Sequence, residues 1–220
     1  MKMKLYRKEG NNILNLFFAG WGMDENPFDH LVQNLQKTED LCICFDYNDL
    51  TFQYEILSHY KEIRVFGWSF GVWVASVIFP EEMLLQLNIT SATAINGTPW
   101  PIDDYKGIPE SIFNGTMNSL SEDNLVRFNR RMCGIKENRD FFETNHPKRN
   151  FDSLHMELKN LGEWMLANNR KRTLKWTNAV IGEKDQIFPF RNQLEMWKEV
   201  PSIITPDAHY ALWIPFLDKN

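Results

Sequence analysis

The chain has 220 residues, of which 43% are hydrophobic and 24% are charged, and this balance excludes a disordered protein. Its formal net charge is −5, so we expect neither general nucleic-acid binding nor attachment to an anionic membrane surface. The first residues turn polar where an export signal would need an apolar stretch. The cysteines are three in number, and Cys42 and Cys44 are awkwardly spaced for a disulfide. We therefore expect a reduced, cytoplasmic protein without a membrane-spanning segment.

Seven apolar, β-prone runs follow one another along the chain, and helix-length segments separate several of them. The expected strands are 3–6, 13–18, 41–45, 63–66, 89–95, 177–181 and 202–205. The expected helices between them are 26–36, 53–60, 70–79 and 193–199. Because alternating strands and helices are typical of a parallel sheet, the sequence predicts an α/β fold. Functional groups in such folds gather at the carboxyl ends of the strands.

The alternation of strands and helices stops between residues 98 and 172, where the sequence becomes helical and polar. Amphipathic patterns cover 122–132 and 154–166. The segment opens with the proline-rich turn TPWPIDD and closes with the basic run NNRKRTLK. We therefore predict a helical cap, residues 98–172, inserted into a core made of residues 1–97 and 173–220.

A candidate nucleophile follows the fourth expected strand, where the sequence reads IRVFGWSFGVWVASVIF. Gly67, Ser69 and Gly71 form a G-x-S-x-G pattern between this strand and the next helix. A nucleophile on so sharp a turn takes a strained backbone, so the residues two positions before and after it must be small. The positive end of the helix also points at the oxygen that becomes charged during the reaction. A chance serine in a turn is the alternative, but the context favours Ser69 as the nucleophile of an α/β-hydrolase.

A serine nucleophile needs a base to take its proton and a carboxylate to orient that base. In α/β-hydrolases the chain order is serine, acid, histidine. Asp185 and His209 each follow an expected strand and fit this order, so we predict them as acid and base. Asp207 is an alternative acid, although its nearness to His209 in sequence disfavours it, and Asp185 could instead cap the helix near Pro189. The other histidines each have a structural explanation: His30, His59, His146 and His155.

An oxyanion hole normally combines the backbone N–H after the nucleophile with one from the loop after an early strand. Phe70 supplies the first donor, and in the turn FFAGWG Trp21 can present the second and roof the pocket. A purely structural turn is the alternative. Trp68, next to the nucleophile, joins the predicted substrate-binding residues. No metal-ligand spacing and no phosphate-binding or dinucleotide-binding glycine pattern occurs, so we expect chemistry that needs neither metal nor cofactor.

The predicted cap holds a positively charged island between residues 127 and 149. Three acidic residues stand there against seven basic ones, namely Arg127, Arg130, Arg131, Lys136, Arg139, Lys148 and Arg149. The spacing of the first three brings their side chains onto one helical face. Arginine clusters bind phosphate and carboxylate groups through paired donors, so the island could dock an anionic macromolecule or a phosphate. A solvated helix face with local ion pairs is the simpler alternative.

Four motifs, FAGWG, GWSFGVWVAS, NGTPWPID and RFNRRMCG, together resemble the BioG-type pimeloyl-[acyl-carrier-protein] methyl ester esterases over nearly the whole chain. GWSFG alone indicates only an α/β-hydrolase, whereas NGTPWPID followed by RFNRRMCG is far more specific. The resemblance implies hydrolysis of the methyl ester of pimeloyl-acyl-carrier protein, with release of methanol, in biotin precursor synthesis. Residue by residue it implies Ser69 as nucleophile, Asp185 as acid and His209 as base, with Trp21 and Phe70 lining the oxyanion hole.

The resemblance also implies a partner, an acidic acyl carrier protein that presents its acyl group on a phosphopantetheine arm. The face of Arg127, Arg130 and Arg131 could bind a carrier helix or the phosphate. Ala19 departs from a common esterase pattern, in which a histidine precedes the glycine of the oxyanion turn, so the details of that loop stay open. Two alternatives remain: a thioesterase or general carboxylesterase with the same triad, and a noncatalytic binding module that docks an acidic partner.

Overall fold

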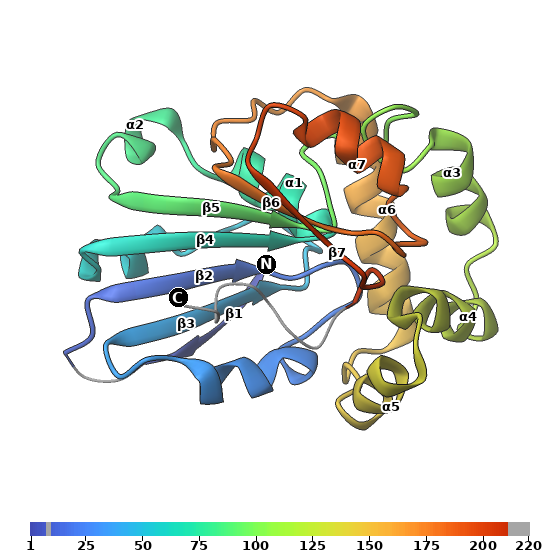
Figure 1. Cartoon of the computed structure of the whole chain (residues 1–220), viewed down its shortest axis with the longest axis horizontal. Coiled ribbons are helices and arrows are strands. Elements are labelled where there is room, and N and C mark those ends of the chain that lie inside the picture. The colour runs from blue at the N-terminus through green and yellow to red at the C-terminus, as the bar shows by residue number, and fades with distance from the viewer. Residues whose placement is uncertain (8–9, 211–220) are drawn as a thin grey trace.

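The computed structural model describes residues 1–7 and 10–210, and a seven-stranded sheet forms its centre (Figure 1). The strand order is β1-β3-β2-β4-β5-β6-β7. Only β1 is antiparallel to its neighbour, β3, and the other pairs are parallel. The strands are β1 (Lys2–Tyr6), β2 (Ile13–Phe18), β3 (Glu39–Phe45), β4 (Glu62–Trp68), β5 (Ile89–Ile95), β6 (Asn178–Gly182) and β7 (Ser202–Thr205). The predicted α/β fold with a mostly parallel sheet is confirmed.

The central strands read as nearly continuous apolar runs because both faces of the sheet are covered. Every residue of β3 is buried, and in β2 only the first residue is partly exposed. Alternate residues enter different cores, since side chains alternate across a strand. Leu16 and Phe18 belong to one hydrophobic cluster, whereas Phe17 belongs to another on the opposite face. These runs are what made the strands recognisable in the sequence.

Helices flank the sheet and follow the strands along the chain. The segment after β4 forms α1, and the segment before β7 forms α7, which begins earlier than predicted. The two early segments, expected at 26–36 and 53–60, are 3₁₀ helices, a tighter form used for short connections. A very short helix, α2, was not predicted. The bounds are η1 (Asn26–Asn34), η2 (Tyr54–His59), α1 (Phe70–Ile78), α2 (Glu81–Leu84) and α7 (Phe190–Trp197).

Four helices lie between β5 and β6, inside the predicted cap. They are α3 (Glu110–Asn118), α4 (Glu122–Cys133), α5 (Lys136–Thr144) and α6 (Phe151–Ala167). In Figure 1 they gather at the end of the sheet to which the arrowheads of β2, β4 and β5 point. The cap segment therefore stands over the carboxyl ends of the strands. Within the part of the chain that the structure describes, no helix is both long and apolar enough to span a bilayer.

Candidate active site

Ser69 lies on the turn between β4 and α1 in a strained backbone conformation, with φ 57° and ψ −127°. The neighbouring glycines leave the space that this turn needs. A Cβ at Gly71 would lie 2.1 Å from the carbonyl oxygen of Phe18, and one at Gly67 would lie 2.8 Å from the backbone of α1. Gly97, which the sequence did not single out, is equally constrained, because its Cβ would lie 2.3 Å from the carbonyl oxygen of Ser69. The structure thus gives the G-x-S-x-G pattern a steric reason.

Asp185 and His209 lie together at the carboxyl ends of β6 and β7. His209 Nδ1 is 2.8 Å from Asp185 Oδ2, and both side chains are buried. Because the carboxylate can only accept, the ring donates from Nδ1 and leaves Nε2 as an acceptor. The other carboxylate oxygen accepts the N–H groups of Ile187 and Phe188, at 2.8 and 2.9 Å. Asp185 therefore shapes its own loop and orients the histidine, whereas α7 begins after Pro189 without a side-chain cap.

The His209 ring packs against two aromatic side chains. The ring centroid of Trp68 lies 5.2 Å away, and that of Phe188 lies 5.8 Å away in a stacked arrangement. The main-chain carbonyl of His209 accepts hydrogen bonds from Trp68 Nε1 at 2.8 Å and from Asn96 Nδ2 at 2.9 Å. Trp68 thus supports the histidine as well as lining the pocket.

Asn96 is a supporting residue that the sequence analysis missed. It follows β5 directly and has a positive φ of 44°. Its side-chain oxygen accepts the N–H of Gly182 at 2.6 Å, and its amide also donates to the carbonyl of Ala208 at 3.0 Å. Asn96 therefore joins the ends of β5 and β6 to the loop that carries His209. Its position after an expected strand was the one signal in the sequence.

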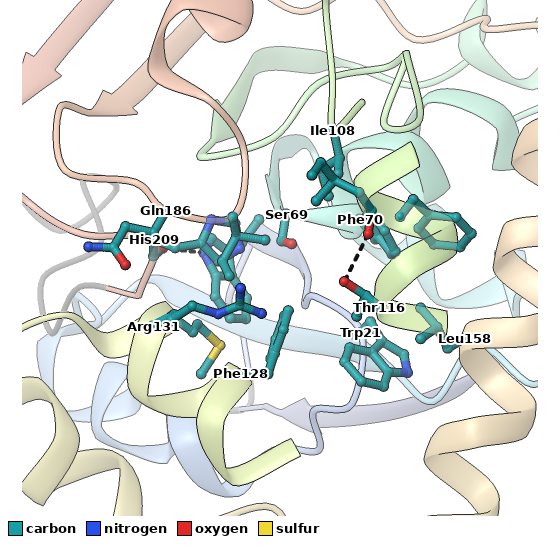
Figure 2. Close-up of a pocket in the computed structure, with 15 residues that line it drawn as sticks. Trp21, Ser69, Phe70, Ile108, Thr116, Phe128, Arg131, Leu158, Gln186 and His209 are labelled. Carbon is teal, nitrogen blue, oxygen red and sulfur yellow. Dashed lines mark hydrogen bonds between the residues drawn. The ribbon is translucent and has the colours of Figure 1, made fainter. Parts of the chain in front are cut away.

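One pocket brings the predicted nucleophile, the predicted base and the predicted oxyanion residues together (Figure 2). It encloses about 600 Å³, part of which is open to solvent. Its lining includes Ser69, His209, Trp21, Trp68 and Phe70. Figure 2 shows Ser69 and His209 facing the same space as side chains from α3, α4 and α6. Most of those side chains are apolar, including Ile112, Phe113, Phe128 and Leu158. Such walls suit the aliphatic part of an acyl group.

The turn after β2 lies directly against Ser69, the predicted nucleophile. A Cβ at Gly20 would be 3.0 Å from the Cβ of Ser69, so the turn and the serine are in van der Waals contact. The next residue, Trp21, lines the pocket, and its indole Nε1 donates to the carbonyl of Leu154 in α6 at 2.8 Å. Its ring packs edge to face on Phe128, with 5.3 Å between centroids. The turn is therefore positioned beside Ser69 where it could form part of an oxyanion hole.

The side chain of Arg149 is buried, although the residue belongs by sequence to the basic island of the cap. Its side chain is 6% exposed and pairs with Glu157 at 2.6 Å and Asp46 at 2.9 Å. Glu157 is fully buried in α6, and burial raises the pKa of its carboxyl although Arg149 pulls that pKa down. The sequence does not reveal this burial, because the partner Asp46 is 103 residues away. Arg149 joins α6 to the end of β3 instead of facing solvent.

Three exposed arginines of the island lie on α4, but they do not border one hollow. Arg131 lines the active-site pocket, over the ring of Phe128. Arg130 lines a separate hollow between α4 and α5, together with Arg139. Arg127 donates to Asn124 on its own helix at 3.4 Å. Consecutive residues of a helix point about 100° apart, so Arg130 and Arg131 face different surroundings.

The fold and the site define the chain as an α/β-hydrolase. An esterase from Exiguobacterium antarcticum shares the fold with a TM-score of 0.64 and 13% identity, over 94% of this chain and 87% of that one. The mostly parallel sheet, the strained turn at Ser69 and the histidine–carboxylate pair are features of that class.

Within the α/β-hydrolases, the comparisons point to one particular family. The model of the family described as pimeloyl-ACP methyl esterase BioG matches residues 1–218. The crystal structure of BioG from Haemophilus influenzae superimposes with a TM-score of 0.84 and 37% identity, over 96% of this chain and 95% of that one. A malonyl-[acyl-carrier protein] O-methyltransferase of Bacteroides fragilis is 45% identical over 197 residues, which are 89% of this chain and 39% of the relative. The chain, which spans well under half of that relative, belongs to the BioG family.

Proposed function

We propose that the chain hydrolyses the methyl ester of pimeloyl-[acyl-carrier protein] and releases methanol. The observation that carries this proposal is the His209–Asp185 hydrogen bond in the pocket where Ser69 occupies its strained turn. Membership of the BioG family supports the substrate. The Bacteroides relative is named as an enzyme that methylates an oxygen of an acyl-carrier-bound substrate, and such a methyl ester is what an esterase would remove.

The reaction begins when Ser69 Oγ attacks the ester carbonyl and His209 Nε2 takes the hydroxyl proton. Asp185 stabilises the imidazolium through Nδ1, and the backbone N–H groups of Phe70 and Trp21 hold the oxyanion. Collapse of the tetrahedral intermediate breaks the bond to the methoxy oxygen, which leaves as methanol with the proton from His209. Water then attacks the acyl-enzyme with His209 as base. The products are the free carboxylic acid and the regenerated serine.

Residues 98–172 act in this proposal as the cap that encloses the acyl chain and meets the carrier. The apolar side chains of α3, α4 and α6 contact the aliphatic chain, and the open part of the pocket lets the phosphopantetheine arm lead out. Arg127, Arg130 and Arg131 are exposed on α4 and attract the acidic carrier protein. The enzyme needs neither metal nor cofactor for this chemistry.

Mass spectrometry of the carrier tests the proposal. Incubation of the protein with the methyl ester of pimeloyl-carrier should lower the carrier mass by one methylene, and Ser69→Ala should abolish the change. An unchanged carrier would contradict the substrate. Release of free carrier thiol would show a thioesterase instead. Failure of Ser69 to react with a fluorophosphonate probe would favour a noncatalytic binding module.

A further inference from the structure

We propose that Glu157, a buried carboxylate of α6, is a positioning residue for the oxyanion turn of residues 19–22. The inference rests on the proposed function, because it assigns a role in the same ester hydrolysis. Glu157 lies in the cap segment, 135 residues from its contact in that turn. It touches neither the proposed nucleophile nor the base, and it acts through the backbone next to Trp21.

The contacts of Glu157 define this role. Oε2 accepts the N–H of Gly22 at 3.1 Å, and Oε1 accepts the N–H of Tyr47 at 2.7 Å. Gly22 has a positive φ of 80°, and its N–H belongs to the peptide plane that follows Trp21. Holding that plane fixes the backbone on one side of the proposed oxyanion donor. The carboxylate therefore sets the direction in which the turn presents Trp21.

The other contacts of the turn hold its remaining parts. The Ala19 N–H donates to the carbonyl of Cys44 at 2.9 Å, and the Tyr47 hydroxyl donates to the carbonyl of Ala19 at 2.8 Å. Trp21 Nε1 donates to Leu154, one turn before Glu157 on α6. The two contacts nearest to the oxyanion donor, at Trp21 and Gly22, thus both come from the cap helix. Without α6 the turn would keep its anchors at Cys44 in β3 and at Tyr47 just after that strand.

The negative charge of Glu157 is balanced by an ion pair with Arg149 beside the oxyanion turn. A buried carboxylate is costly unless it is paired and hydrogen-bonded. Arg149 supplies the charge at 2.6 Å and also donates to the carbonyl of Met23 at 3.2 Å, just past the turn. Asp46 contacts the other guanidinium nitrogen of Arg149 at 2.9 Å. Asp46 thus belongs to the same ion cluster as Glu157, and its carboxylate bonds Arg149, Lys2 and Asn48 instead of the turn.

This arrangement gives a matched pair of variants, Glu157→Gln and Asp46→Asn. Each removes one negative charge from the same buried cluster. Only Glu157→Gln also deprives either Gly22 or Tyr47 of the acceptor for its N–H group, because one amide oxygen cannot serve both. Hydrolysis of p-nitrophenyl butyrate, binding of a phenylboronic acid and thermal unfolding are measured for both. The boronic acid forms a tetrahedral adduct with the serine and reports on oxyanion stabilisation.

For Glu157→Gln we expect kcat to fall about 10–100-fold, with KM within about threefold of wild type and a parallel loss of boronic acid affinity. Asp46→Asn should lower the unfolding temperature about as much as Glu157→Gln does, because both variants unbalance the same ion cluster. Its kcat and its boronic acid affinity should nevertheless stay within about threefold of wild type. Glu157→Asp, which keeps the charge but shortens the side chain, is a second variant that should also lose kcat.

Three results would overturn the inference. Both Glu157 variants could retain kcat, Asp46→Asn could lose as much kcat as Glu157→Gln, or neither Glu157 variant could fold, which would make the role structural only. A wild-type protein that neither hydrolyses the ester nor reacts with a fluorophosphonate would instead overturn the proposed function, and the inference with it.

Discussion

The proposed base is held by side chains from several parts of the chain. Asp185 bonds its ring, Trp68 and Phe188 pack on the ring, and Asn96 bonds its carbonyl. Gln193 in turn donates to Asp185 at 3.0 Å, so the carboxylate is also fixed. A histidine held in this way changes little in position between the two proton transfers. The site is thus arranged before substrate binds.

Replacing Asp185 by Asn tests the orienting role. The amide cannot act as the charged acceptor for the Nδ1–H group, so the imidazole loses both its tautomer preference and the stabilisation of its charged form. We expect kcat for a soluble ester to fall by about 10³–10⁴, with KM nearly unchanged. Asp207→Asn, at the alternative acid, is the control and should lose much less. A larger loss in the control would reassign the acid.

Replacing Gly71 by Ala tests the steric reason for the nucleophile turn. The added Cβ would lie 2.1 Å from the carbonyl oxygen of Phe18, and backbone must move to relieve the clash. We expect the free energy of unfolding to fall by roughly 2–4 kcal/mol, measured in urea.

Gly115→Ala is the matched control, because a Cβ there meets nothing within 4 Å and the position lies in α3. This variant should gain about 0.5–1 kcal/mol from helix propensity. A loss of stability at Gly115 as large as that at Gly71 would contradict the steric argument.

The residues of the site differ in how far the sequence reveals them. Ser69, Asp185 and His209 could be named because the chemistry limits their residue types and chain order. Asn96 and Glu157 could not, because their contacts join residues 113 and 135 positions apart, and any buried polar residue has the same local signature. Their roles depend on tertiary packing that no local pattern encodes.

At the scale of elements, the strands were predictable and half of the cap helices were not. The strands are buried apolar runs with clear ends. Helices α4 and α6 begin with side-chain caps, from Ser121 and Asn150, and have amphipathic patterns. Neither α3 nor α5 has a side-chain cap, and α5, with the sequence KENRDFFET, has little apolar surface of its own. Packing within the cap, and not local propensity, forms these two helices.

Helix α4 also permits a test of carrier docking. Arg131 lines the active-site pocket, so charge reversal there would confuse docking with catalysis. The variant Arg127→Glu with Arg130→Glu leaves Arg131 intact and reverses two exposed charges. We expect KM for the carrier-bound ester to rise about tenfold or more, while turnover of a soluble ester stays unchanged.

Lys37→Glu with Lys61→Glu is the control for α4, because it makes the same change in net charge at exposed positions before β3 and β4. Its KM for the carrier-bound ester should stay close to that of wild type. Equal losses in both double variants would show a general charge effect and would remove α4 as the docking helix.

At the scale of the whole molecule, several contacts fasten the cap segment to the core, and two of them concern the proposed site. One is the ion cluster of Arg149, Glu157 and Asp46. The other is the loop of His209, where the N–H of Tyr210 donates to the carbonyl of Met132 at 2.9 Å. Both attachments lie next to groups proposed for catalysis. Movement of the cap would therefore disturb the site.

The cysteines can report such movement, because all three are free and buried. Burial raises the pKa of Cys133 in the cap to about 12 and raises the pKa of Cys44 in β3, so little of the reactive thiolate forms at neutral pH. We expect slow reaction of the native protein with a disulfide reagent, and peptide mapping should show that Cys133 reacts before the sheet cysteines. Rapid labelling of a sheet cysteine would contradict this order.

The fastening at Tyr210 has a consequence for altering the substrate range. Exchange of cap segments between members of the family is an obvious way to alter the acyl group accepted. The backbone around His209, however, relies on the Met132 carbonyl and on Asn138, whose amide donates to the carbonyl of Tyr210 at 2.9 Å. A transplanted cap that does not place a main-chain carbonyl and a side-chain amide at these two positions would change the pocket wall and also weaken the support of the proposed base. Successful chimaeras should therefore be those that carry both groups across with the graft.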